Sequence, residues 1–144
     1  MTKILVFAVS IIWLSLSGKS VSNEQQKDIT VINIDFQYNF KNDTADIKVN
    51  NVLIGHHMVL NSGYVGFTDI SLKITRRYKQ QYKIEFLNNV KYCHRSDKIK
   101  LAVNLNGKES LYFLNPHEGK WVGLGKGDGN TLDLTQQKRP FVYE

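Results

Sequence analysis

The sequence predicts an all-β fold, specifically an antiparallel β-sandwich, and three observations support this prediction. Ile99–Leu114 contains two alternating apolar runs joined by Asn106-Gly107, which is the strongest short-range signal of a β-hairpin. Thr30–Phe40 alternates between apolar and polar side chains along its whole length, as a half-buried strand does. Beyond residue 22, no segment has the i, i+3, i+4, i+7 apolar spacing of an amphipathic helix.

The register of the Ile99–Leu114 hairpin depends on the length of its loop. A two-residue loop places Leu105 opposite Lys108. A three-residue loop, Leu105–Gly107, places Leu111 and Phe113 on the face shared with the apolar side chains of the first strand. This second register separates apolar from polar side chains better, and a slip of one residue would exchange the two faces. We therefore expect the three-residue loop.

Residues 1–22 have the pattern of an export signal. Lys3 supplies the positive start, Ile4–Leu16 is the apolar segment, and Ser20-Val21-Ser22 fits the small-x-small rule for cleavage after Ser22. The apolar run is too short to cross a bilayer, which needs roughly 20 residues. We expect a mature chain that is secreted or periplasmic and has no transmembrane span.

The mature chain is expected to be one domain. Residues 23–29 form a polar tail, and residues 30–144 are enough for a single apolar core. The full chain carries a formal charge of +6, and export removes two lysines, so the remaining charge is too small for a nucleic-acid-binding protein. Cys93 is the only cysteine and cannot form an internal disulfide.

The strands are expected in the following order. One face of Thr30–Phe40 is expected to be buried: Ile32, Ile34, Phe36, Tyr38 and Phe40. Asp46–Met58 reads as a second hairpin in which Asn51 takes the left-handed position. The remaining strands are Ile70–Thr75, Gln81–Leu87, Lys120–Leu124 and Thr131–Thr135.

The segments between these strands are expected to be turns and connections. Val90–Asp97 reads as a long connection, Asn115–Gly119 as a turn and Gly125–Asn130 as a hairpin loop. Gln136–Glu144 is a polar tail in which Phe141–Tyr143 could dock as an edge strand after Pro140. About eight or nine short strands separated by turns favour a sandwich, immunoglobulin-like in outline, with a small β-barrel as the alternative.

Several short motifs resemble a known group of proteins. The strand ending Val49-Asn50-Asn51, the pair Gly66-Phe67, the run Gly119–Gly123 and the closing Arg139–Glu144 resemble small exported β-sandwich proteins of unknown activity from Gram-negative bacteria. The resemblance implies an exported sandwich without catalytic residues.

Two clusters suggest metal binding. Successive residues of a strand point to opposite faces, so we expect His56 and His57 to separate, one buried and one exposed, and to bind no metal together. Asp128, Asn130 and Asp133 lie in a glycine-rich loop of the kind that can bind calcium. The loop lacks the spacing and the closing glutamate of a calcium site, and it contains a lysine, so no metal or cofactor is expected.

Two arrangements suggest catalysis. Cys93-His94 could be a nucleophile and its base, but adjacent residues rarely present their side chains to each other, so we expect a lone thiol. A pair of carboxylates could hydrolyse glycosides if the fold brought them together, and the candidates are Asp35, Asp46, Asp69, Glu85 and Glu109. Alternation places most of these on outward positions, so the chain is not expected to be an enzyme.

Aromatic and basic residues are the better indication of function. Not all of the aromatic residues Tyr64, Tyr92, Tyr112, Trp121 and Tyr143 belong to the clean apolar stripes. Such rings could stack on sugars, although aromatic residues of this kind more often belong to the core. Basic residues gather in two groups, one with Lys73, Arg76, Arg77 and Lys79 and one with Lys91, Arg95, Lys98 and Lys100. Such groups attract anions but also form ordinary solvated faces. We take these six residues as the candidate ligand-binding set: Tyr64, Tyr92, Tyr112, Trp121, Arg76 and Arg77.

The sequence therefore predicts an exported, non-enzymatic binding or interaction module whose partner is a glycan, an anionic surface or an envelope protein. Nucleic acid is not expected as a partner. The alternatives are a small hydrolase whose carboxylates meet only in the fold, and an assembly subunit that adds a strand to a partner. Asn42-Asp43-Thr44 also matches an N-glycosylation sequon, which matters only in a eukaryotic host.

Overall fold

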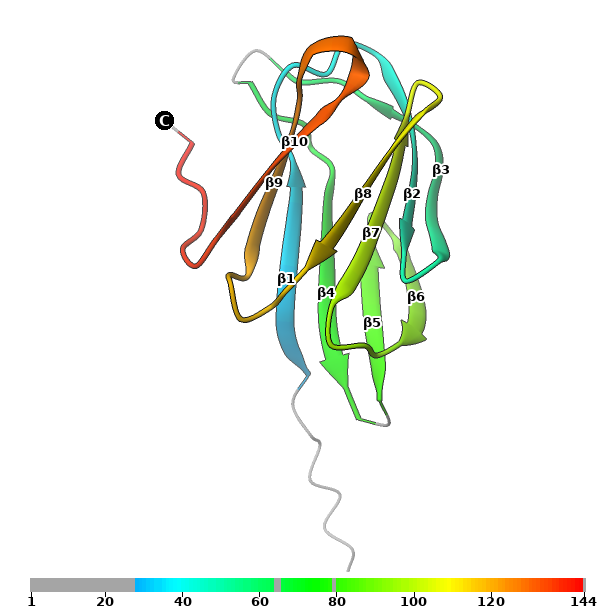
Figure 1. The fold of residues 1–144 in the computed structure, drawn as a ribbon, viewed down its shortest axis with the longest axis vertical. Helices are drawn as coiled ribbons and strands as arrows, with labels where there is room; N and C mark the ends of the chain where they lie inside the picture. Colours follow the sequence, from blue (N-terminus) through cyan, green and yellow to red (C-terminus); the bar gives the residue numbers. More distant parts are fainter. Residues whose placement is uncertain (1–27, 64–65, 79, 144) are drawn as a thin grey trace, which may run out of the picture.

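Two β-sheets face each other across one apolar core in the computed structural model of this chain (Figure 1). The structure describes residues 28–63, 66–78 and 80–143. The predicted export segment, its cleavage site after Ser22, most of the polar tail and the candidate ligand-binding residue Tyr64 lie outside these described residues. Within them, no helix has the length and apolar character needed to cross a bilayer.

The larger sheet has six strands in the order β10-β9-β1-β4-β5-β6. Their bounds are β1 Ile29–Phe36, β4 Ser71–Arg77, β5 Gln81–Phe86, β6 Asn89–His94, β9 Trp121–Lys126 and β10 Leu132–Gln137. The smaller sheet has four strands in the order β3-β2-β7-β8. Their bounds are β2 Asp43–Val49, β3 Val52–Leu60, β7 Ile99–Leu105 and β8 Lys108–Leu114.

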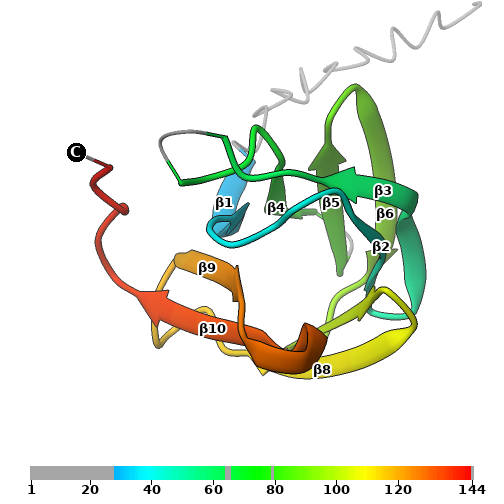
Figure 2. The ribbon, with the colours of Figure 1, turned by 90° about the horizontal axis from the view of Figure 1, so that it is seen from above.

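Neighbouring strands are antiparallel in both sheets, with β1 and β9 as the exception because they pair in parallel. The predicted all-β sandwich is confirmed. The small-barrel alternative is not what the described strands form, because they divide into two separate sheets. Seen from above, the strands of both sheets surround one interior, with β8 next to β10 (Figure 2).

The core is built from the alternating apolar side chains of both sheets. The larger sheet contributes Ile32, Ile34, Phe36, Leu72, Ile74, Ile84, Phe86, Val122 and Leu124. The smaller sheet contributes Ala45, Ile47, Val49, Leu60, Ile99, Leu101, Val103, Leu105 and Leu114. The period-two patterns of the predicted strands therefore identified most of the core directly.

The expected three-residue loop in the β7–β8 hairpin is wrong. Leu105 pairs with Lys108, and Asn106 and Gly107 both have positive φ, at 50° and 87°, as a two-residue type I′ turn requires. Asn106 also fixes the turn, because its Oδ1 accepts the N–H of Thr44 at 2.8 Å. Consequently Leu111 and Phe113 face outward and are 46% and 59% exposed.

Three further expectations are corrected. Tyr38 is exposed rather than buried, because β1 ends at Phe36 and the chain turns at Asn39, which has φ 66°. Residues 90–97 are not mainly a connection, since β6 occupies Asn89–His94. Phe141–Tyr143 forms no strand.

The second hairpin is confirmed, and both Asn50 and Asn51 are left-handed in its turn.

Candidate functional site

A pocket of about 340 Å³ lies between the ends of the two sheets. Its polar lining comes from distant parts of the chain: Arg76, Tyr82, Arg95, Asp97, Lys98 and His117. The β6–β7 and β8–β9 connections that supply part of this lining lie toward the lower end of the sandwich in Figure 1. The fold therefore brings Arg76 of the first basic group to the same pocket as Arg95 and Lys98 of the second.

The β6–β7 connection is held in position by hydrogen bonds at several points. The N–H of Arg95 donates to the carbonyl of Gln80 at 2.8 Å, and the hydroxyl of Tyr82 donates to the carbonyl of Ser96 at 3.0 Å. Asn50, in the β2–β3 turn, donates through Nδ2 to the carbonyl of His94 at 3.0 Å. The positions of the basic residues are thus set by both sheets.

Positive charge dominates this pocket. Three basic side chains, Arg76, Arg95 and Lys98, line it with one carboxylate, Asp97. Among the described residues, no carboxylate lies within 4.0 Å of the side-chain nitrogens of these three cations. Burial raises the pKa of Tyr82, and the charges of Arg95 and Arg76 oppose that rise. The pocket can therefore attract an anion and offer it hydrogen-bond donors.

Two of the six predicted ligand-binding residues meet on the outer face of the larger sheet. Nη1 of Arg77 donates to the hydroxyl of Tyr92 at 3.3 Å, and the Arg77 guanidinium carbon lies 5.7 Å from the centre of that ring. Nε of Arg77 also lies 3.4 Å from Asp28. Arg77 is thus engaged with its neighbours, whereas Arg76 lines the pocket.

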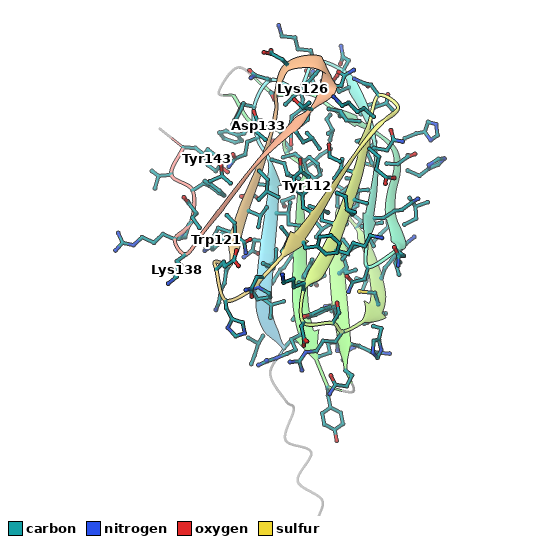
Figure 3. All side chains as sticks on the ribbon, viewed as in Figure 1. Tyr112, Trp121, Lys126, Asp133, Lys138 and Tyr143 are labelled. Atoms are coloured by element: carbon teal, nitrogen blue, oxygen red, sulfur yellow. The ribbon has the colours of Figure 1, made fainter. Side chains whose placement is uncertain are left out.

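Tyr112 and Trp121 belong neither to the pocket lining nor to the Arg77–Tyr92 pair. The hydroxyl of Tyr112 donates to the carbonyl of Leu132 at 2.6 Å and so ties β8 to β10. Trp121 is half-buried on β9, opposite Asn33 of β1 and Gln137 of β10, and the two aromatic side chains lie well apart in Figure 3. The predicted set therefore does not form one surface. Of the residues that line the pocket it contained only Arg76, and those that it omitted include Arg95, Lys98 and His117.

Two of the candidate carboxylates, Asp35 and Asp69, line a second pocket of about 260 Å³. Tyr143 of the C-terminal tail lies there as well. Its hydroxyl donates to Asp35 at 3.3 Å, and its ring centre lies 4.4 Å from that of Phe67. Burial raises the pKa of Asp35, although the Tyr143 hydroxyl opposes this. The tail predicted as an edge strand docks through this tyrosine instead (Figure 3).

The other residues considered for catalysis or calcium binding either lie apart from each other or lie beside basic side chains. Cys93 is buried and His94 is exposed on the adjacent position of β6, so the expectation of a lone thiol is confirmed. Asp128 and Asp133 line a third pocket together with Lys41 and Lys126. Two ammonium groups beside two carboxylates do not favour a calcium ion.

His56 and His57 do not separate as expected. Both side chains are exposed, and their Nδ1 atoms are 3.1 Å apart. The expectation of one buried and one exposed imidazole is wrong because a β-bulge in β3 interrupts the alternation. Gly55, immediately before the pair, was the available signal, since an isolated glycine within a strand often marks a bulge.

Comparisons of this chain with protein-family models, with curated proteins and with solved structures find no match. The likeness to exported sandwich proteins thus rests on the short motifs alone, and function is argued from the geometry of the chain itself.

Proposed function

We propose that this chain is an exported, non-enzymatic binding module that recognises an acidic saccharide at the pocket formed by Arg76, Arg95 and Lys98. The observation that carries the proposal is that one cation of β4 and two cations of the β6–β7 connection line one pocket. The same residues have no carboxylate partner among the described residues. Cations that stabilised the fold would be expected to have such partners.

The chemistry of the lining supports an acidic sugar. Guanidinium groups bind carboxylates and sulfates through paired hydrogen bonds, and Arg76 and Arg95 offer two of them. Asn115 and His117 add side chains that can hydrogen-bond hydroxyl groups. A volume of about 340 Å³ is at the small end for ligand sites, which suits one or two sugar residues.

The proposal includes two further expectations from the sequence, an immunoglobulin-like topology and export of the chain. A two-layered sandwich with binding residues in the connections at one end is the arrangement that immunoglobulin-like domains use. The signal pattern in residues 1–22 supports export. An extracellular or periplasmic location would expose the pocket to acidic polysaccharides.

Calorimetric titration of residues 23–144 with acidic and neutral oligosaccharides of equal length tests the proposal. We expect binding of the acidic members only, weakened by salt because surface charges are screened. The double variant R76Q/R95Q should reduce affinity at least about tenfold, because charge-assisted hydrogen bonds contribute about 1.5–3 kcal/mol each.

The control is K138Q/R139Q, which removes the same charge from the exposed C-terminal tail. Equal loss of affinity in both double variants would indicate only general attraction to a basic protein. Binding to anionic lipid vesicles but not to acidic saccharides would overturn the choice of ligand.

A hydrolase is the second candidate, supported by Asp35 and Asp69 in one pocket. A carboxyl group with a raised pKa suits a general acid, and a second carboxylate could act as base or nucleophile. Chromogenic glycosides provide the assay. Activity that is lost in both D35N and D69N, and kept in D133N, would support this function over simple binding.

A further inference from the structure

Asp46, His56 and His57 form an exposed cluster on the outer face of the smaller sheet, apart from the saccharide pocket. Asp46 belongs to β2 and both histidines belong to the neighbouring strand β3. One ligand atom from each residue lies within 4.8 Å of the other two. The cluster is therefore assembled by strand pairing, and nothing in the proposed function uses it.

A β-bulge creates this arrangement. Ala45 pairs with Met58 and Ile47 pairs with Gly55, so that Asp46 alone faces the two histidines. His57 has φ 50°, which is uncommon for a residue other than glycine. The bulge turns two successive side chains to the same side, where regular alternation would send them to opposite faces.

The backbone also fixes the carboxylate. The N–H of His57 donates to Oδ1 of Asp46 at 2.8 Å, and Nδ1 of His56 lies 2.9 Å from the same oxygen. The carboxylate of Asp46 is thus oriented toward the two imidazoles before any ligand arrives.

The three ligand atoms have the spacing of a coordination site. Nδ1 of His56 lies 2.9 Å from Oδ1 of Asp46 and 3.1 Å from Nδ1 of His57. The third side of the triangle, from Nδ1 of His57 to Oδ1 of Asp46, is 3.8 Å. An ion just outside the plane of this triangle can lie roughly 2 Å from all three atoms, which is the length of zinc–nitrogen and zinc–oxygen bonds.

Protons alone satisfy this triangle poorly. When both imidazoles are neutral, each Nδ1 carries either a proton or a lone pair, while the carboxylate oxygen offers only lone pairs. If Nδ1 of His56 donates to Asp46, its proton can reach Nδ1 of His57 only through a bent, shared hydrogen bond. If Nδ1 of His56 accepts from His57, its lone pair faces the carboxylate. A cation at the centre would satisfy all three atoms at once.

We propose that Asp46, His56 and His57 bind one divalent transition-metal ion, such as Zn²⁺ or Cu²⁺. Imidazole nitrogen with one carboxylate suits zinc, copper and nickel, whereas calcium and magnesium prefer sites made of oxygen. Three protein ligands leave at least one coordination position for water or an incoming group. By the Irving–Williams order, Cu²⁺ binds more tightly than Zn²⁺.

The test is titration of the untagged protein with Zn²⁺, Cu²⁺ and Mg²⁺, followed by calorimetry. We expect one Zn²⁺ or Cu²⁺ ion per chain, tighter binding of Cu²⁺, and none of Mg²⁺. His57→Asn keeps a residue that tolerates positive φ, and His56→Gln keeps a polar side chain. Each should weaken Zn²⁺ binding at least about tenfold, since even the partners of metal ligands contribute 10–100-fold.

His94→Gln is the matched control, because His94 is exposed on β6 and lies outside the cluster. Electron paramagnetic resonance of the Cu²⁺ form should show two coordinated nitrogens in the original protein and one in His57→Asn. Absence of saturable Zn²⁺ and Cu²⁺ binding overturns the proposal. Equal loss of binding in His94→Gln and His57→Asn does so as well. The saccharide titration is independent of both results.

Discussion

The carboxylate of Asp43 lies 2.6 Å from Nζ of Lys126 and joins the beginning of β2 to the end of β9. The pair therefore ties the smaller sheet to the larger one at one end of the sandwich. Asp43 is almost fully buried and also accepts the N–H of Lys41 and Nδ2 of Asn106. The side chain of Asp43 thus connects the turn before β2, the β7–β8 hairpin and the opposite sheet.

We expect D43N to lower the free energy of unfolding by about 2 kcal/mol at pH 7. Removing one partner of a buried ion pair costs about 3–5 kcal/mol, and the partial exposure of Lys126 reduces this. Urea denaturation measures the difference. D128N, which changes an exposed carboxylate near the same end, is the control and should leave the stability nearly unchanged.

The stabilisation that Asp43 gives the folded state should decrease as the pH is lowered. Burial opposes its ionisation, but hydrogen bonds from Lys126, Lys41 and Asn106 outweigh burial and hold its pKa below the usual value. A carboxylate with a lowered folded-state pKa stabilises the fold above its unfolded pKa of about 3.9. That stability is lost as the pH falls through the folded-state pKa, so the difference between wild type and D43N in urea denaturation should shrink as the pH is lowered below about 4.

Gly107→Ala should destabilise the β7–β8 turn by about 1–2 kcal/mol, because a side chain is strained in the left-handed conformation. A Cβ atom at this position meets no atom within 4 Å, so the effect would come from the backbone alone. Gly63→Ala is the control, since its φ is not in the left-handed region and its nearest contact is 3.7 Å. A cost as large for Gly63 as for Gly107 would contradict this account.

Phe113 and Leu114 distinguish the two possible registers of the same hairpin. Phe113 is exposed and Leu114 is buried, so F113S should change the stability by less than about 0.5 kcal/mol. L114A should cost about 3 kcal/mol, as truncation of a buried leucine does. Thermal and urea unfolding of the two variants measure both values. A larger loss of stability in F113S than in L114A would instead support the register with a three-residue loop.

The thiol of Cys93 should react slowly while the protein is folded. Cys93 is 6% exposed, and burial raises its pKa, so both access and the thiolate fraction are low. We expect reaction with Ellman's reagent at pH 8 to be more than roughly tenfold slower in buffer than in concentrated urea. Equal rates in the two solvents would show that β6 opens readily.

The features that depend on neighbouring residues along the chain could be predicted from the sequence. Alternation identified β1, β4, β5 and the buried faces of β2 and β7, because one side of each strand must exclude water. Asn50-Asn51 and Asn106-Gly107 marked two turns, because asparagine and glycine tolerate positive φ. These local rules were sufficient for the all-β class and for most of the core.

Features that depend on contacts between distant residues could be seen only in the folded chain. Asn106 bonds to the start of β2, which helps to fix the two-residue turn and leaves Phe113 outside. Arg76 and Arg95 meet only because the β6–β7 connection lies across the end of β4 and β5. The bulge opposite Asp46 turns His56 and His57 to one side. Contacts between different strands and connections set each of these three arrangements. The alternation of side chains along a single strand does not report such contacts.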